Sequence, residues 1–167
     1  RLAEKFDKAI ELAELMALAF PRSDSVRLRA EALEQWADVI AARLNEGDNT
    51  AQVSHREQSQ AKHHEAAELY TQLAQLELRS TDYPNILWLA ITNFQQAGEL
   101  ERANELLVDY LRHEDRTKRP RGYLALGRNY VDAARWQRAI DPLQRCRIEH
   151  PTHPISFEAR LLAAKAH

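Results

Sequence analysis

Residues 84–119 read PNILWLAITNFQQAGELERANELLVDYLRHEDRTKR, and residues 120–154 read PRGYLALGRNYVDAARWQRAIDPLQRCRIEHPTHP. In each copy, two amphipathic segments flank a short turn, at residues 96–99 and at residues 132–135. A repeated unit of this length cannot bury its apolar side alone, so the copies are predicted to stack. A shift of 36 positions pairs Leu87 with Tyr123, Ala90 with Leu126, Phe94 with Tyr130, Ala103 with Ala139, Leu107 with Leu143 and Tyr110 with Cys146.

The composition of the chain agrees with a helical domain. Apolar residues make up 44% and charged residues 29% of the 167 positions, with four glycines and six prolines, which is typical of a soluble helical protein. The net charge of −2 excludes a strong overall attraction to nucleic acid or to an anionic membrane. The single cysteine, Cys146, excludes an internal disulfide, and no apolar run approaches the roughly 20 residues that span a bilayer.

Helical periodicity continues upstream of the two copies. Apolar residues spaced for one helix face run through residues 2–20, where Pro21 ends the segment. We expect Ser23 or Asp24 to cap a second helix that ends near Gly47.

The stretch at residues 48–64 is the least regular part of the sequence, because most of its side chains are polar. An apolar stripe returns at Ala66 and continues to Leu76, and Pro84 separates it from the next helix. No alternating run of Val, Ile and Thr is present, so no β-strand is predicted.

Residues 84–151 resemble tetratricopeptide repeats (TPRs). In that family, the first helix of a repeat (helix A) carries a large residue, then Leu-Gly, then an aromatic residue three positions after the glycine. The second helix (helix B) carries a small, a bulky and a small residue, and a proline follows it. The first copy departs from this pattern at Ile91 and Asp115 but keeps Phe94, Gly98, Ala103 and Leu107. The second copy matches throughout, with Tyr123, Leu126, Gly127, Tyr130, Ala139, Leu143, Cys146 and Pro151.

These matching residues have packing roles. We expect Gly127 and Ala139 to face each other where helices A and B cross closely, since a larger side chain would push the helices apart. Leu100 and Trp136 are expected to fill the turns.

The resemblance extends less strongly beyond residues 84–151. Residues 7–21 and 65–76 resemble helix B, and residues 155–167 resemble the helix A of a truncated repeat. The implied organisation is a single domain over residues 1–167, with a terminal helix at 1–21, a long helix pair or a repeat with an insertion at 24–79, repeats at 84–119 and 120–154, and the truncated repeat at 155–167.

The resemblance also implies where a partner would bind, because TPR ligands lie on a concave face lined by helices A. Trp88 and Arg128 would form an anchor pair, since Trp and Arg are frequent binding hot spots. The alternative is that Trp88 packs against a preceding helix and Arg128 only faces solvent. The implied partner-binding residues are Asn85, Trp88, Thr92 and Gln95 in the first copy and Arg121, Leu124, Arg128 and Val131 in the second.

A chaperone-tail carboxylate clamp is not predicted. Chaperone-binding members of the family hold a terminal carboxylate with Lys, Asn and Arg side chains on successive helices A. The corresponding residues here cannot form such a clamp: they are Trp88, Thr92, Ala125, Glu158 and Leu162 or, one repeat earlier, Ala51, His55, Leu89, Arg121 and Ala125.

Three polar clusters provide alternatives to a protein-binding face. A basic run could contact phosphate, although Glu114 and Asp115 within it favour a solvated loop. The pair His63-His64 suits a solvated helix face. Three soft ligands could meet at a helix end, but a fourth metal ligand is missing. The basic run comprises Arg112, Arg116, Lys118, Arg119 and Arg121, and the soft ligands are Cys146, His150 and His153.

The sequence therefore predicts an all-α protein, and the resemblance implies a right-handed α-solenoid of about eight helices in antiparallel pairs. The leading hypothesis is a protein–protein interaction scaffold within a larger protein, in which a peptide or helix binds the concave face. One alternative is a structural or oligomerisation scaffold through residues 24–79, and another is nucleic-acid binding through residues 112–121. We expect no enzyme active site, no metal and no cofactor. The partner is not identified by the sequence, and a cytoplasmic location is only a default expectation.

Overall fold

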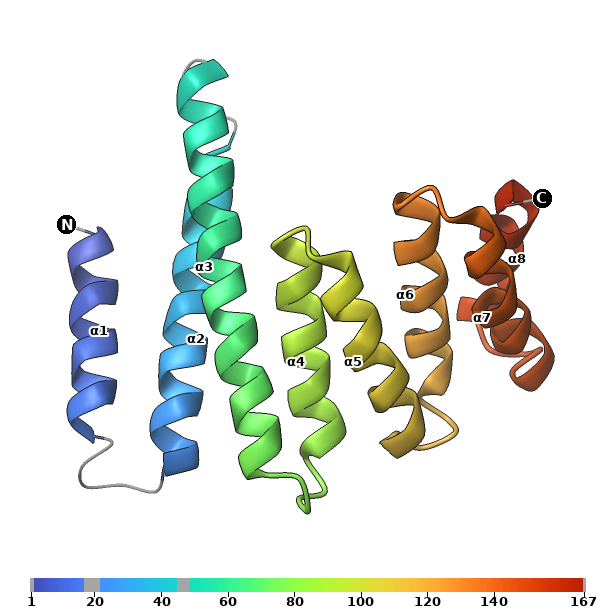
Figure 1. Cartoon of the computed structure of the whole chain (residues 1–167), viewed down its shortest axis with the longest axis horizontal. Helices are drawn as coiled ribbons and strands as arrows, with labels where there is room; N and C mark the ends of the chain where they lie inside the picture. The colour runs from blue at the N-terminus through green and yellow to red at the C-terminus, as the bar shows by residue number, and fades with distance from the viewer. Residues whose placement is uncertain (1, 17–21, 45–48, 167) are drawn as a thin grey trace. The chain divides into compact units, whose positions relative to one another are not determined.

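The structure, a computed structural model, describes residues 2–16, 22–44 and 49–166. These residues form α-helices and contain no β-strand (Figure 1), so the predicted all-α class is confirmed. In chain order the described helices are α1 Leu2–Met16, α2 Arg22–Ala41, α3 Asn49–Leu76, α4 Tyr83–Gln96, α5 Leu100–His113, α6 Arg119–Asp132, α7 Trp136–Glu149 and α8 Ile155–Ala166.

The helices belong to two compact units. The first unit, Arg1–Glu99, contains α1 to α4, and the second unit, Leu100–His167, contains α5 to α8. Within the first unit α1 packs on α2, α2 on α3 and α3 on α4. Within the second unit α6 packs on α5, α7 and α8, and α7 also packs on α8.

The sequence repeat is reproduced in the helix bounds. Helices α6 and α7 begin and end 36 positions after α4 and α5. The turns also share their main-chain hydrogen bonds, because the amides of residues 97, 98 and 99 donate to the carbonyls of residues 93, 95 and 94, and residues 133–135 repeat this pattern. Gly98 and Ala134, with φ of 81° and 54°, supply the left-handed backbone of the two turns.

The core of the first unit forms around α3, which packs on both α2 and α4. Ala66, Tyr70 and Leu73, the residues that resembled a helix B, are buried on α3. The irregular polar stretch belongs to the same helix, which runs without interruption from Asn49 to Leu76. Alanines on α2 and α3 let the two backbones approach closely, and four of them are almost completely buried: Ala30, Ala37, Ala66 and Ala67.

The start of α2 differs from the prediction. The helix begins at Arg22, so Ser23 and Asp24 lie within its first turn and do not precede it as caps. Asp24 is still favourable there, because a carboxylate in the first turn complements the helix dipole. The predicted helix ends at Phe20, Pro21 and Gly47 lie outside the described residues.

The core of the second unit contains Gly127 at a close helix crossing. A Cβ atom at this position would lie 2.4 Å from Cδ2 and 2.5 Å from Cγ of Leu143. The predicted close contact is therefore present, and the three atoms nearest to such a Cβ all belong to Leu143. The buried cluster around this crossing comprises Tyr123, Leu124, Ala139, Leu143, Cys146 and Ala159.

The predicted role of Trp136 in filling the turn is wrong. Its side chain is 44% exposed, because the whole stretch from residue 132 to residue 138 lies at the surface. Leu100, at the equivalent position of the first copy, is half-buried. None of the helices in the described ranges combines the length and the apolar character needed to cross a membrane.

Candidate interaction site

The four predicted binding residues of the first copy lie on α4, in the first unit. None of them belongs to the buried set of this helix. Asn85 is exposed, and its Nδ2 donates to Asp82 Oδ1 at 2.8 Å. Thr92 Oγ1 donates to the carbonyls of Trp88 and Leu89 at 3.1 and 3.0 Å, so this hydroxyl serves the helix itself. Trp88 and Gln95 are half-buried.

The predicted residues of the second copy lie on α6, in the second unit, and two of them support the core. Leu124 is buried in the cluster around Gly127, and Val131 packs against the same cluster. An apolar side chain at position 124 therefore does not need an external partner to cover it, because α6 already packs on α7 and α8.

The other two predicted residues of α6 are arginines with carboxylate partners. Arg128 is 51% exposed and forms an ion pair with Glu158 of α8. Arg121 is half-buried, donates from Nη2 to Glu114 Oε2 at 3.1 Å, and lies over the ring of Tyr110. Arg128 is the more accessible of the two cations.

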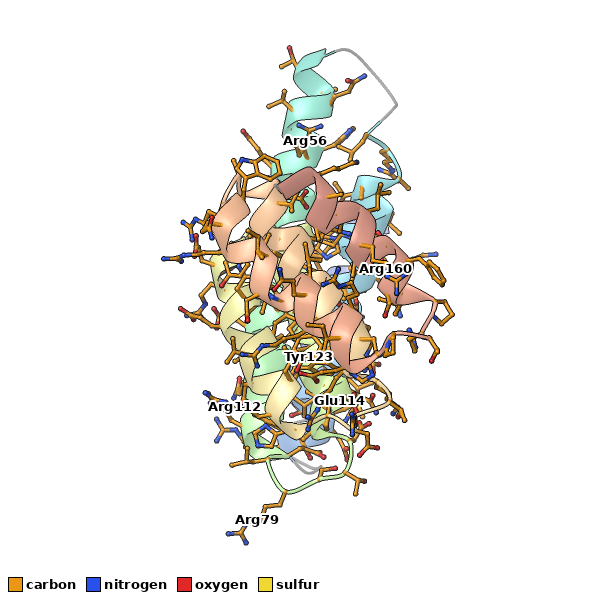
Figure 2. All side chains as sticks on the ribbon, turned by 90° about the vertical axis from the view of Figure 1, so that its right-hand side faces the viewer. Arg56, Arg79, Arg112, Glu114, Tyr123 and Arg160 are labelled. Carbon is orange, nitrogen blue, oxygen red and sulfur yellow. The ribbon has the colours of Figure 1, made fainter. Side chains whose placement is uncertain are left out.

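The predicted basic run is organised around Glu114, which is only 4% exposed. Figure 2 labels Glu114 beside the end of α5, with Arg112 on the same helix. Its carboxylate accepts hydrogen bonds from the Tyr110 hydroxyl at 2.8 Å, the Asp115 amide at 2.9 Å and Arg121. Arg119 Nε donates to the carbonyl of Glu114 at 3.0 Å, so two cations of the run are engaged by one residue.

This arrangement determines the protonation of Glu114. Burial alone would raise the pKa of its carboxyl group. The hydrogen bonds from Tyr110, Asp115 and Arg121, together with the charge of Lys118, outweigh burial and hold this pKa below its ordinary value of 4.5. Glu114 is therefore ionised near neutral pH.

A buried polar network in the first unit was not predicted. Asn93 of α4 donates from Nδ2 to Glu34 Oε1 at 3.0 Å, and the Tyr70 hydroxyl donates to Glu34 Oε2 at 2.6 Å. His63 Nδ1 lies 2.9 Å from Asn93 Oδ1, and its Nε2 lies 3.7 Å from Asp38. The network joins α2, α3 and α4. The prediction of a solvated His63-His64 pair is therefore wrong, because His63 is 4% exposed and His64 bonds to Glu99.

The sequence contained one signal for this network. Asn93 and Asn129 are related by the 36-residue shift, so an asparagine recurs inside an apolar stripe of both copies. Both side chains are buried. Asn129 Nδ2 donates to Asn104 Oδ1 at 2.8 Å, which satisfies the second asparagine with a different partner.

The three soft ligands of the metal hypothesis do not form a metal site. In the part of the chain that the structure describes, no group of three His, Cys, Asp or Glu side chains is placed to hold an ion. Cys146 is completely buried in the core, and its Sγ lies 3.9 Å from Ser156 Oγ. His153 Nδ1 instead accepts a hydrogen bond from the Ile155 amide at 3.2 Å.

The helix pairs, the shared turns and the glycine at the crossing define the class of protein as an array of TPR-like helix repeats. Comparison with solved structures agrees. A crystal structure from Podosopora anserina, described as a kinesin light chain with nearly identical TPR-like repeats, matches with a TM-score of 0.53 at 18% identity, covering 97% of this chain and 85% of that chain. A glutamine-to-methionine variant of that protein gives the same TM-score and identity and is covered over 84% of its length.

At this identity the likeness shows the fold, and the TPR-like class predicted from the sequence is confirmed at that level. No protein-family model and no curated protein sequence matches the chain.

Proposed function

We propose that the chain is a protein–protein interaction scaffold that binds a peptide or a helix through its helices A, with α4 offering a contact surface within the first unit and α6 within the second unit. The observation that carries the proposal is the recurrence of one helix–turn–helix unit, with the same bounds and turn hydrogen bonds, in a TPR-like fold. In such arrays each helix uses part of its surface for stacking and leaves the remainder to a partner.

We assign the principal contact of the first unit to Trp88 of α4 and that of the second unit to Arg128 of α6. Among the eight predicted residues, Leu124 and Val131 support the core, and Thr92 bonds to its own helix. Trp88, which is half-buried, and the exposed Arg128 are of the two residue types that most often dominate binding energy. The aliphatic part of an arginine that pairs with a surface carboxylate can still pack on a partner.

The test is affinity capture with the full 167-residue chain, followed by affinity measurement with the captured partner. We expect Trp88→Ala with Arg128→Ala to weaken binding by more than about tenfold, the scale of a hot-spot loss, with unchanged helical content. The single variants report on each unit separately. Trp136→Ala, which removes an exposed indole from α7, is the matched control and should bind as the parent does.

Glu158→Gln tests whether Arg128 contacts the partner directly or acts only through its ion pair with Glu158. It removes the carboxylate partner of Arg128 and leaves the guanidinium in place. Parent-like affinity in this variant supports direct contact by Arg128. Unchanged affinity in the Trp88 and Arg128 double variant would place the partner elsewhere.

A structural or oligomerisation role for α2 and α3 is the second candidate, and exposed apolar residues on these helices favour it. Val53 and Leu76 of α3 are 57% and 44% exposed, and Leu28 of α2 is 41% exposed. A scaffold of this kind should sediment faster as its concentration rises, and Val53→Ser should reduce that effect. A single sedimentation coefficient across concentrations would exclude it.

A further inference from the structure

A groove between α7 and α8 lies outside the contacts proposed above. It encloses a volume of about 230 Å³, and the apolar side chains of Leu143, Ala163 and Ala164 form part of its lining. Gln144, Arg147 and Arg160 complete the lining. All six residues belong to the second unit, so the groove is formed within one compact body.

The two helices that form the groove also carry exposed apolar side chains outside its lining. Phe157 and Leu161 of α8 are 64% and 59% exposed, and Ile148 of α7 is 67% exposed. Phe157, Leu161 and Ala164 follow one another at intervals of four and three residues, so they share one side of α8. Ile148 follows Gln144 by four residues and shares its side of α7. The apolar surface therefore runs along both helices, and an exposed surface of this kind marks an interaction site.

Two arginines carry the charge of the groove. Within the described residues, neither Arg147 nor Arg160 forms an ion pair with a carboxylate. The guanidinium of Arg160, labelled on α8 in Figure 2, lies 5.4 Å from the ring centre of Phe157. Glu158, the carboxylate next along α8 from Phe157, is paired with Arg128. The groove thus combines an apolar lining with uncompensated positive charge.

We propose that the α7–α8 groove, defined by the six lining residues above, binds an amphipathic α-helix whose apolar stripe is flanked by carboxylates. The carboxylates complement Arg147 and Arg160, which present forked N–H donors that match carboxylate geometry. The apolar stripe covers Phe157 and Leu161. The lining residues include neither Trp88 nor Arg128, so the proposal does not depend on their role.

The helical form of the occupant follows from the walls of the groove. Both walls are α-helices whose main-chain amides and carbonyls bond within the helix, so an extended strand would find no main-chain partners there. A helix needs only side-chain ridges that fit between the ridges of its neighbours. Helix α7 already packs on α6 in this manner, because the side chain of Leu143 fits over Gly127.

The experiment uses the full chain and two synthetic helical peptides of the same length as α7. Both peptides contain Leu at positions i, i+4 and i+7 and Ala elsewhere on that face. One carries Glu and the other Lys on its flanks. We expect the Glu peptide to bind about tenfold or more tightly than the Lys peptide by calorimetry, and Arg147→Glu with Arg160→Glu to reverse this preference. Leu161→Ser should weaken binding of both peptides.

Arg112→Glu with Arg138→Glu is the matched control, because it makes the same charge change at exposed residues outside the groove. This control should keep the preference for the Glu peptide. Equal binding of the two peptides, or an equal effect of the two double variants, would overturn the proposal. Self-association of the chain that disappears in the Arg147 and Arg160 variant would also overturn it, because the occupant would then be a second copy.

Discussion

In the turn after α4 the left-handed residue is Gly98, whereas in the turn after α6 it is Ala134. The three main-chain hydrogen bonds are nevertheless the same in both turns. A left-handed conformation is readily adopted by glycine and costs an alanine roughly 1–2 kcal/mol. The second turn therefore keeps the same hydrogen bonds although alanine disfavours the left-handed backbone. We infer that the flanking helices determine the conformation of the turn and that a glycine only lowers its strain.

The helices around the turns differ more strongly. Ile91 is buried where the second copy has Gly127, so one position takes a large side chain in the first copy and excludes even a methyl group in the second. At the end of the pair, Tyr110 and Glu114 of the first copy correspond to Cys146 and His150 of the second. Equivalent backbone positions therefore carry the charged Glu114 network in the first copy and an uncharged cluster around Cys146 in the second copy.

The largest effect is expected at Ile91. Ile91→Ala should lower the free energy of unfolding by about 2–5 kcal/mol, because the side chain is fully buried and its loss leaves a cavity. Urea unfolding measures the change, and Ile91→Val, expected to cost about 0.5–1.5 kcal/mol, is the graded control. A loss well under 1 kcal/mol for the alanine variant would contradict this expectation, because it would mean that position 91, like position 127, does not need a large side chain.

Glu114 should produce the next largest effect. Glu114→Gln is expected to cost about 1.5–3 kcal/mol near neutral pH, since it weakens hydrogen bonds to a buried charge. Because the folded pKa of Glu114 lies below 4.5, its stabilisation is complete above that pH and is lost as the pH falls through the folded pKa. Thermal melting of parent and variant should therefore converge below about pH 4.5.

The equivalent residue of the second copy should titrate in a different range. Burial lowers the pKa of His150 below its ordinary value of 6.5, so folding favours the neutral ring, and stability falls as the pH drops below 6.5 through the folded pKa. His150→Phe should remove this earlier step and leave the Glu114 step in place. A melting profile that is unchanged by the substitution would contradict the expectation.

Gly127 should give an intermediate effect. Gly127→Ala is expected to cost about 1–3 kcal/mol by overpacking, since the new methyl group would meet Leu143 at 2.4 Å. Adding Leu143→Ala should make the combined loss smaller than the sum of the two single losses. Strict additivity in denaturant unfolding would show that the two residues do not touch.

Gly98 tests the first turn. Gly98→Ala should cost about 1 kcal/mol, because φ is 81° and an L-residue is strained there. Steric contact adds little, since the new Cβ would lie 3.6 Å from Gln60 Nε2. A melting temperature equal to that of the parent would remove the distinction between the two turns.

The smallest effect is expected at Ala134. Ala134→Gly relieves the left-handed alanine but adds freedom to the unfolded chain, so the two terms nearly cancel and the change should stay within about 0.5 kcal/mol. Differential scanning calorimetry can resolve its sign. A loss above 1 kcal/mol would mean that the alanine methyl group contributes packing.

The repeat made much of the fold predictable. Apolar spacing and the 36-residue shift located the helices and turns of residues 84–149 to within a residue or two, because a helix that must bury one side repeats its pattern at 3.6 residues. The close approach at Gly127 was also predicted. The contact with Leu143 was not predicted, because the small-residue pattern of Gly127 and Ala139 does not tell how far a neighbouring leucine side chain reaches.

The polar interior could not be predicted from periodicity. Glu34 and Asn93 bond across 59 positions of sequence, and no local pattern links them. His63 was expected at the surface because its neighbours along α3 are polar, yet it is buried against α2 and α4 by tertiary packing. Among the predicted binding residues, Leu124 proved to be a core residue, because an apolar residue on the exposed side of an isolated repeat is covered once α8 is added.

The uninterrupted course of α3 has a mechanical consequence. Its 28 residues make a rod about 42 Å long, compared with about 30 Å for α2 and about 21 Å for α4, and Figure 1 draws it extending past the end of α4. Its C-terminal half packs against α2 and α4 and carries the Tyr70–Glu34 hydrogen bond, so this half is the base of the rod. Any molecule held near Val53 is kept at a set distance from that base. Deleting two helical turns would shorten this reach by about 11 Å and leave the buried network intact.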